Sequence, residues 1–275
     1  MNTAVITPVH RRHDHLSKQQ AALAGLLDAP ALRVVVAMDD PAVASFVVAP
    51  PVSADTILVD LERGAAGLPV AAARNAGAAA ALDRAVDLLV FLDVDCLPAP
   101  QLVRRYGDAA TDPAAAHSLL CGPVAYLPPP PPNGYDLSRL PEAPVHEARP
   151  APPDGKLETG GDPRLFWSLS FAVTATVWRE IGGFHEGYQG YGAEDTDFAM
   201  VAAAAGVGIT WVGGATAYHQ WHPTSSPPVQ HLEDILRNGA IFAERWGWWP
   251  MEGWFTDFAG MGLVEHDGRG WTRCI

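Results

Sequence analysis

Cysteine and positive charge are both scarce in this sequence. The three cysteines, Cys96, Cys121 and Cys274, lie far apart and form no CxxC pair, which excludes a disulfide framework and predicts a reducing compartment. Lysine and arginine together number 18 against 31 aspartates and glutamates, so the formal net charge is −13. This balance argues against binding to nucleic acid, which requires clustered positive side chains.

Long apolar runs are also absent. No stretch reaches the roughly 18 apolar residues of a membrane span, and no charged-then-apolar leader precedes the first predicted strand. We therefore expect a cytoplasmic protein without stable membrane insertion. Peripheral membrane contact stays open, because Arg11-Arg12 and Arg104-Arg105 are local basic pairs. The 275 residues, 48% of them hydrophobic, suffice for one large α/β domain or two small ones.

Apolar runs alternate with helical periodicity in the first part of the chain. Strands are predicted at 4–9, 32–38, 56–60 and 88–92, and helices at 14–28 and 69–84. Asp14 suits the N-cap of the first helix, and Pro69 suits the first turn of the second. The alternation predicts parallel pairing with right-handed crossovers, in a sheet covered by helices on both faces.

Four polar side chains fall at the carboxyl ends of these strands: Thr7, Asp39, Asp60 and Asp93. In sheets of this kind, ligands bind beyond the carboxyl ends of the strands. The convergence predicts a ligand site at that edge, independently of any motif.

The segment from Leu127 to Pro163 interrupts the pattern with many prolines, including the run Pro128 to Pro132. Such a composition predicts no regular element. The segment is interpreted either as a disordered surface insertion or as a mobile lid over an acceptor site.

Regular structure is predicted again after this insertion. We expect a strand at 165–173, a helix at 194–205, short strands at 207–212 and 215–219, and an amphipathic helix at 229–246. Trp246, Trp248, Trp249 and Trp254 follow closely, which favours packing of a C-terminal segment onto the body over a tryptophan-lined sugar platform.

Asp93-Val94-Asp95 directly follows the apolar run Leu88 to Leu92. Two carboxylates one residue apart offer hard oxygen ligands to Mg²⁺ or Mn²⁺. A divalent cation there stabilises the charge that develops on a nucleoside diphosphate leaving group. The alternative is a chance pair in a solvated turn.

His219, after the short apolar stretch Thr216 to Tyr218, is the second predicted ligand. An imidazole combined with a carboxylate favours Mn²⁺ over Ca²⁺. His222 is the alternative ligand, and an H-x-x-H pair suits Zn²⁺, although no further cysteine or histidine cluster supports zinc. A structural histidine in a loop is the other interpretation.

Glu194-Asp195 follows the glycine- and aromatic-rich stretch 182–193. At a helix N-terminus the two carboxylates are expected to stay ionised. Asp195 is then the base that accepts the proton of an acceptor hydroxyl, while Glu194 binds acceptor hydroxyls. The alternative is helix capping, which needs only one of the two residues.

Arg74 and the pair Asp39-Asp40 have two interpretations each. Arg74 either forks onto a diphosphate or holds the nucleotide aspartates, unless it faces solvent. Asp39 and Asp40 accept hydrogen bonds from a nucleobase edge or ribose, unless they serve only the turn before Pro41.

Together these motifs resemble family 2 glycosyltransferases. Ile6 to Arg12 resembles the opening of that family, and Asp39-Asp40, Ala73-Arg74-Asn75-x-Gly77 and Asp93-x-Asp95 follow in the family's order. The stretch 182–197 resembles the acceptor-side motif of β-1,4-galactosyltransferases, chondroitin polymerases and polypeptide N-acetylgalactosaminyltransferases. Tyr218-His219 is similar to their metal-binding histidine segment, so that the likeness covers roughly residues 3–222.

The resemblance implies an α/β protein with a GT-A fold, in which a Rossmann-like, mixed, mostly parallel central sheet is flanked by helices and followed by a C-terminal helical segment. It implies a catalytic domain over 1–225. Within it, 1–97 would bind the nucleotide sugar and 98–225 the acceptor, with the proline-rich insertion at 127–163. Residues 226–275 would form a helical, tryptophan-rich segment packed on the body.

The activity implied is that of a metal-dependent hexosyltransferase, inverting, with a UDP- or GDP-sugar donor, Mn²⁺ or Mg²⁺ and a saccharide or other hydroxyl acceptor. The site residues implied are Thr7, Pro8, Arg11, Asp39, Arg74, Asp93 and Val94 for the nucleotide sugar; Asp95, His219 and Asp93 for the metal; Trp167, Tyr191, Gly192 and Glu194 for the acceptor; and Asp195 with Glu194 for catalysis.

Two departures from the family pattern concern the acceptor side. Tyr191-Gly192-Ala193 stands where relatives often carry tryptophan-glycine-glycine, and the insertion 127–163 has no counterpart. A sugar-phosphate nucleotidyltransferase is one alternative function, but Thr7 to Leu16 lacks the glycine-rich loop that cradles a triphosphate. A non-catalytic nucleotide-sugar-binding module is the other alternative.

Overall fold

The computed structural model describes residues 1–47 and 55–274, and within them eight strands form one central sheet. In spatial order these strands are β3 (Asp55–Leu61), β2 (Leu32–Met38), β1 (Thr3–Val9), β4 (Leu88–Leu92), β9 (Ser170–Thr174), β6 (Ser118–Cys121), β10 (Gly208–Val212) and β8 (Leu157–Thr159). The first four strands pair in parallel, as predicted, whereas β9 runs antiparallel between β4 and β6. The predicted mixed, mostly parallel sheet is confirmed.

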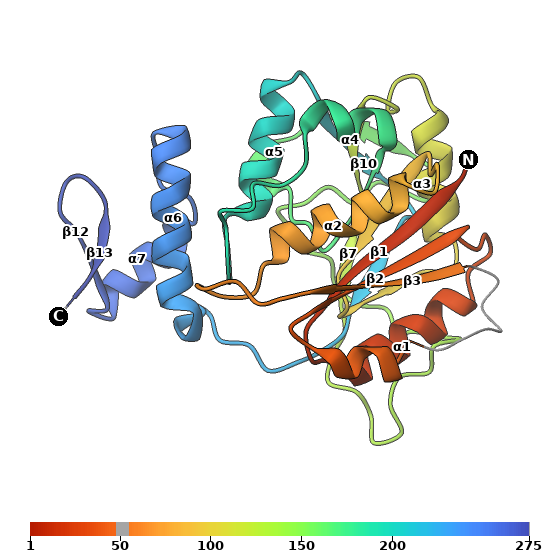
Figure 1. Ribbon diagram of the computed structural model, residues 1–275, viewed down its shortest axis with the longest axis horizontal. Coiled ribbons are helices and arrows are strands. Elements are labelled where there is room, and N and C mark those ends of the chain that lie inside the picture. The colour runs from red at the N-terminus through yellow and green to blue at the C-terminus, as the bar shows by residue number, and fades with distance from the viewer. Residues whose placement is uncertain (48–54, 275) are drawn as a thin grey trace.

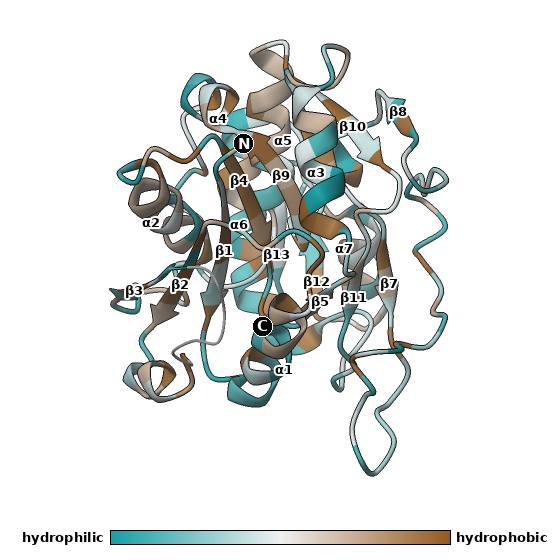
Figure 2. Ribbon diagram, turned by 90° about the vertical axis from the view of Figure 1, so that its right-hand side faces the viewer, coloured by the Kyte–Doolittle hydropathy of each residue, from teal (hydrophilic) through white to brown (hydrophobic). Residues whose placement is uncertain are grey.

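Alternate residues of the central strands enter two apolar cores, one on each face of the sheet. Ile6 and Phe91 face the core that is covered by α2 (Val70–Leu82), α4 (Ala175–Ile181) and α5 (Glu194–Ala204). Val5 and Val90 face the opposite core, which α3 (Leu102–Thr111) and the end of α1 (His13–Ala24) cover. Strands β2 and β4 are accordingly brown, that is hydrophobic, in Figure 2. Burial on both faces explains their uninterrupted apolar sequences.

A small second sheet positions the residues of interest. It consists of β5 (Cys96–Pro98), β11 (Ala217–His219) and β7 (Val124–Tyr126). β5 pairs antiparallel with β11 so that Cys96 lies opposite His219. Because Asp95 immediately precedes Cys96, this register brings the carboxylate after β4 close to the histidine that ends β11.

The C-terminal segment extends to one side of the central sheet (Figure 1). It comprises α6 (Leu232–Trp246), α7 (Glu252–Gly260) and the hairpin of β12 (Val264–His266) and β13 (Trp271–Arg273). Trp246 donates its indole N–H to Asp197 of α5 at 2.7 Å, and Trp248 packs edge-on against Phe242. Trp249 packs on Phe255 of α7. Trp246 therefore makes a contact with the body of the predicted kind, whereas the ring contacts of Trp248 and Trp249 lie within the C-terminal segment.

Several predicted elements differ from the structure. The helix predicted at 14–28 ends at Ala24, where Gly25 closes the last turn, and Arg12 rather than Asp14 is its N-cap. The strand predicted at 165–173 is wrong in its first half, because a 3₁₀ turn at Pro163–Leu165 precedes β9. Asp162 caps that turn by accepting from the Arg164 backbone N–H at 2.9 Å.

The proline-rich insertion also contains an element that composition excluded. Leu157–Thr159 forms the edge strand β8 by pairing with β10, and an isolated bridge joins Ala125 to Val145. Such short strands are formed through hydrogen bonds from a neighbouring strand rather than through their own periodicity. Helices α3, α4 and α7 were not predicted, although α3 carries a clear i, i+4 apolar spacing at Leu102, Tyr106 and Ala110.

No helix within residues 1–47 and 55–274 combines the length and the apolarity that crossing a membrane requires.

Candidate cation and carboxylate site

Asp95, His219 and His222 form a cluster of ligand atoms that all lie within 4.8 Å of one another. Asp95 Oδ2 is 3.7 Å from Nε2 of His219 and 3.6 Å from Nε2 of His222. The Gln220 N–H donates to the Asp95 carbonyl at 2.7 Å, so the β5–β11 pairing continues into the loop that carries both histidines. The structure thus brings together Asp95, the preferred histidine and the alternative histidine.

The electrostatics of this cluster suit a cation. Burial raises the pKa of Asp95, but hydrogen bonding with His222 and the charges of His219 and Arg12 outweigh it and lower that pKa to about 2. Burial lowers the pKa of His219, which keeps its imidazole in the neutral, ligating form. An ionised carboxylate beside neutral imidazole nitrogen is a donor set that fits Mn²⁺.

Asp93, the other aspartate of the motif, lies outside this cluster and pairs with an arginine. Arg74 of α2 is 2% exposed and donates from Nη2 to Asp93 Oδ1 at 3.0 Å and from Nη1 to Glu194 Oε1 at 3.2 Å. Its guanidinium also lies 5.3 Å from the centroid of the Phe184 ring. Arg74 therefore connects the aspartate loop after β4 to the first residue of α5. Of the interpretations above, the solvent-facing arginine is wrong, and Arg74 instead holds Asp93, one of the aspartates predicted to bind the nucleotide sugar.

We expect Arg74→Met to lower the free energy of unfolding by about 3–5 kcal/mol at pH 8, because it leaves Asp93 and Glu194 without their buried partner. Burial, partly opposed by Arg74, already raises the pKa of Asp93 to about 6, and loss of the guanidinium raises it further. A carboxyl group with a raised pKa in the folded state destabilises that state least at or below about pH 4, which is its pKa in the unfolded state. The destabilisation is largest once the pH exceeds its pKa in the folded state.

Urea unfolding at pH 5 and pH 8 measures this difference. Arg74→Lys, which keeps the charge but loses the fork, is the matched control and should lose less stability than the methionine variant. A loss that is equal at both pH values would contradict an electrostatic origin.

Asp195 has a different protonation behaviour from the one predicted. Burial and the neighbouring charge of Glu194 raise its pKa to about 7, although the Thr196 N–H donates to Asp195 Oδ1 at 2.7 Å. The expectation that the helix N-terminus keeps this carboxylate fully ionised is therefore wrong, since desolvation outweighs the helix end. A carboxylate with a pKa near neutrality has the proton affinity that a general base needs.

The loop before Glu194 has a glycine-type backbone at the alanine that departs from the family pattern. Ala193, the N-cap of α5, has φ of 75°, in the left-handed region that favours glycine. Gly190 has φ of 76°, and a Cβ there would overlap the Asp234 carboxylate. The backbone thus takes the glycine-type path at Ala193, at a cost of about 1 kcal/mol.

Asp197, the last acidic residue of the motif, has a structural role. It is 1% exposed and accepts from Tyr188 Oη at 3.1 Å, Arg245 Nε at 2.7 Å and Trp246 Nε1 at 2.7 Å. It fastens α6 to α5. The sequence contained no signal for Arg245, because its partner lies 48 residues away.

The residues predicted to bind the acceptor lie in two places. Tyr191 is 42% exposed and stacks on His231 at 4.5 Å, while Gly192 accepts from Asn238 of α6 at 3.0 Å. Burial raises the pKa of Tyr191 to about 12, and the negative charges of Asp195 and Glu194 add to this effect. Trp167 instead contacts the proline-rich insertion, through His146 at 4.6 Å and the guanidinium of Arg149 at 5.1 Å.

The strand residues predicted to bind nucleotide support the site from inside. Thr7 is 2% exposed and donates to Gln19 Oε1 at 3.0 Å, and Gln19 in turn donates to the carbonyl of Asp93 at 2.7 Å. Pro8 is buried within β1. Val94 is buried in the small apolar cluster that also contains Leu16.

Asp39, Asp40 and Arg11 surround the carboxyl ends of β1 and β2. Asp39 is exposed, whereas Asp40 accepts from the Arg11 backbone N–H at 2.6 Å and from His13 at 2.9 Å. The Arg11 side chain is exposed. Asp40 therefore joins the loop after β1 to the loop after β2, and Asp39 projects beside it.

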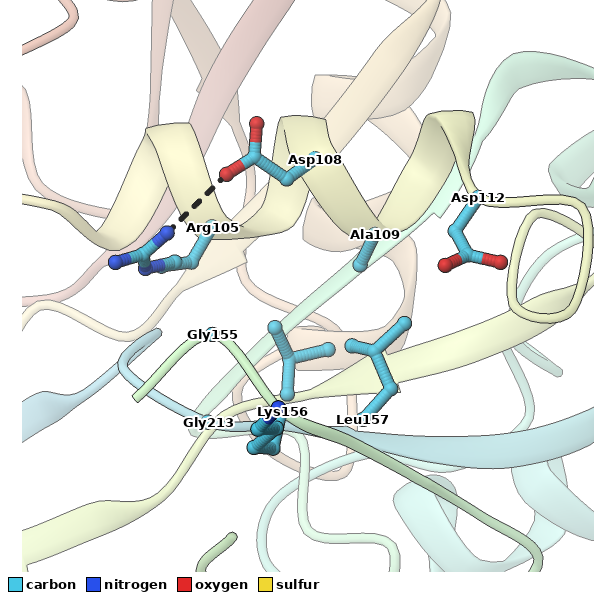
Figure 3. Close-up of a pocket in the computed structure, with 9 residues that line it drawn as sticks. Arg105, Asp108, Ala109, Asp112, Gly155, Lys156, Leu157 and Gly213 are labelled. Carbon is cyan, nitrogen blue, oxygen red and sulfur yellow. Dashed lines mark hydrogen bonds and ion pairs between the residues drawn. The ribbon is translucent and has the colours of Figure 1, made fainter. Parts of the chain in front are cut away.

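Two of the hollows on the described surface differ in their relation to the cluster. One, of about 570 Å³, adjoins the cation cluster and is lined by Arg12, Lys18, Tyr135, Trp221 and His222 among others. The insertion thus forms part of a wall, and Tyr135 accepts from the Trp221 N–H at 3.2 Å. The other, of about 270 Å³, lies between α3 and the β8 edge and contains Arg105 and Lys156 (Figure 3). None of the predicted site residues lines the second hollow.

Comparison with known proteins finds similarity to glycosyltransferases over parts of this chain. The family model of the N-terminal domain of galactosyltransferase matches residues 163–223. Validoxylamine A glucosyltransferase of Streptomyces hygroscopicus subspecies jinggangensis is 31% identical over 160 residues, which cover 52% of this chain and 37% of that protein. The match therefore spans little more than a third of the length of this curated relative.

Solved structures share the fold at low sequence identity. TarS 1–349 of S. aureus in complex with UDP has a TM-score of 0.58 at 15% identity, covering 88% of this chain and 66% of that one. GalNAc-T7 with UDP, GalNAc and Mn²⁺ has a TM-score of 0.59 at 12% identity, covering 89% of this chain and 50% of that one. The predicted GT-A fold and the predicted resemblance to GT-A glycosyltransferases are confirmed.

Proposed function

Because the chain has the GT-A fold of glycosyltransferases, we propose that it is a metal-dependent hexosyltransferase. It transfers a hexose from a UDP- or GDP-sugar to a hydroxyl of a saccharide or similar polyhydroxyl acceptor, with inversion at the anomeric carbon. Relatives support the parts of this proposal: one is named a glucosyltransferase, and solved neighbours contain UDP and Mn²⁺.

A single observation carries the proposal, namely that one buried arginine joins Asp93, two residues before Asp95 of the cation-type cluster, to Glu194 of the acidic pair. Asp95 belongs to the cluster, Asp93 follows β4 two residues earlier, and Arg74 connects Asp93 to Glu194. Sugar transfer needs a charge-stabilising group at the leaving diphosphate and a separate base at the acceptor hydroxyl. The ion pairs of Arg74 connect the aspartate loop of the proposed cation site to Glu194, the neighbour of the proposed base.

In the proposed mechanism, Asp95, His219 and His222 would hold a divalent cation, Mn²⁺ or Mg²⁺, which would supply Lewis-acid stabilisation of the diphosphate when bound. Asp195 accepts the proton of the attacking hydroxyl, for which its raised pKa of about 7 is suited. Glu194, fixed by Arg74, binds acceptor hydroxyls and maintains that pKa through its charge. Attack on the face opposite the leaving group inverts the configuration.

The acceptor is proposed to lie between Asp195 and Tyr191. The Tyr191 ring stacks on the His231 ring, and its centroid lies 5.8 Å from that of Trp254 in α7. Aromatic rings next to carboxylates suit a ring-shaped polyol, whose C–H face packs on the aromatic surface while its hydroxyls bind carboxylate oxygens. Trp167 is proposed to contribute through the insertion that it contacts.

A donor screen tests the proposed function. We expect a UDP- or GDP-hexose to raise the melting temperature in the presence of Mn²⁺ and not in its absence, since binding to the native state stabilises by mass action. With saccharide acceptors, nucleoside diphosphate should be released, and NMR of the product should show an inverted anomeric centre. Release of pyrophosphate from a nucleoside triphosphate and a sugar phosphate would instead indicate a nucleotidyltransferase. Donor binding without any turnover would indicate a binding module.

A further inference from the structure

Arg12 donates from Nη1 to Asp95 Oδ2 at 2.7 Å. The same oxygen faces Nε2 of His219 and Nε2 of His222. The Arg12 guanidinium is therefore hydrogen-bonded to the same carboxylate oxygen that both proposed histidine ligands of the cation face. We propose that Arg12 exchanges partners: it is paired with Asp95 before the divalent cation binds, and it moves to the donor diphosphate once the cation has taken that oxygen. This inference rests on the proposed function.

The Arg12 guanidinium and a divalent cation compete for Asp95 because both are positively charged. A divalent cation bound to Asp95 Oδ2 would lie next to the positive guanidinium that shares this oxygen, and two positive charges at contact distance repel. This repulsion favours departure of the Arg12 side chain when a cation binds at Oδ2. Within residues 1–47 and 55–274, Asp95 is the one ion-pair partner of Arg12.

The side chain of Arg12 is free to make this movement. It is 37% exposed, whereas the Arg74 side chain is 3% exposed and held by two carboxylates. Its backbone, by contrast, is fixed at the start of α1, where its carbonyl accepts from the Leu16 N–H at 3.0 Å. A fixed main chain with a partly solvated side chain permits rotamer exchange without rearrangement of the helix.

The destination is the hollow that adjoins the cluster. Arg12, Lys18 and His222 line it, and His222 also belongs to the cation cluster. Arg12 and Lys18 outnumber Asp14, the one acidic residue of the lining, in a chain whose net charge is −13. A diphosphate that binds the cation would direct its remaining oxygens into this hollow, where a guanidinium binds phosphate oxygens in a fork. Cation and donor binding then become thermodynamically coupled through Arg12.

The test measures Mn²⁺ binding by the electron paramagnetic resonance signal of free Mn²⁺, and UDP and GDP binding by calorimetry, on the full chain. We expect Arg12→Gln to bind Mn²⁺ alone at least about fivefold more tightly than the wild type, since a competing ion pair has been removed. In saturating Mn²⁺, the same variant should bind UDP or GDP about tenfold more weakly. Arg12→Lys, which keeps the charge, should give intermediate values.

Arg104→Gln is the matched control, because it removes one arginine from an exposed ion pair, with Asp28, remote from the cluster. It should change neither affinity. Equal or weaker Mn²⁺ binding by Arg12→Gln would overturn the exchange while leaving the proposed function intact. Absence of Mn²⁺ binding by both the wild type and Arg12→Gln would overturn the cation site of the proposed function and the exchange together.

Discussion

We expect Asp195→Asn to lower kcat for sugar transfer by about 10³-fold while it leaves the Kd of the donor within about twofold. The amide keeps the size and the hydrogen bond from the Thr196 N–H but cannot accept a proton. Asp195 is proposed to contact the acceptor hydroxyl and not the nucleotide, so donor affinity should persist. Steady-state kinetics and donor calorimetry on the same preparation measure both quantities.

The pH profile gives this prediction a second readout. The pKa of Asp195 is raised to about 7, so the wild-type rate should rise with pH between about 5.5 and 8 and then level off, since the ionised carboxylate is the active form. Glu194→Gln removes the neighbouring charge that helps raise this pKa, and the rising limb should therefore shift to lower pH. Asp108→Asn on α3 is the matched remote control and should keep the wild-type profile. Parallel loss of donor affinity and rate in Asp195→Asn would argue against the base role.

Asp95→Asn should reduce Mn²⁺ affinity by about 100-fold or more and abolish transfer at micromolar Mn²⁺. Asp95 is the sole carboxylate of the described cluster with His219 and His222, so its replacement leaves a cation without an anionic ligand. Manganese titration, and the rise in melting temperature that Mn²⁺ produces in the wild type, measure the effect. Retention of wild-type Mn²⁺ affinity would show that the cation binds elsewhere.

A pair of histidine variants identifies which imidazole ligates. His219→Gln and His222→Gln each remove one of the two ring nitrogens near Asp95 Oδ2, at 3.7 and 3.6 Å. If both are ligands, each variant should weaken Mn²⁺ binding by about tenfold or more. If only His219 ligates, as the sequence favoured, His222→Gln should retain Mn²⁺ affinity.

Local sequence was sufficient for the elements whose signal is continuous. The apolar runs 32–38 and 88–92 became β2 and β4 with the predicted boundaries, because strands buried on both faces require apolar side chains throughout. The polar residues at their carboxyl ends were predicted for the same reason, since a strand that is buried along its length ends where polar groups begin. Short edge strands such as β8 were missed because pairing with β10 stabilises them.

What the sequence determined by itself is the type of chemistry: an aspartate motif after a buried strand, an acidic pair behind a glycine-rich loop and a histidine segment, in one order along the chain. Tertiary structure alone decided which of these residues meet. The antiparallel β5–β11 register places Asp95 near both histidines. Asp93 instead forms an ion pair with Arg74, which also pairs with Glu194. Burial likewise decided that the pKa of Asp195 is near 7. Desolvation and ion pairing depend on neighbours that are distant along the chain, and such neighbours leave no local pattern.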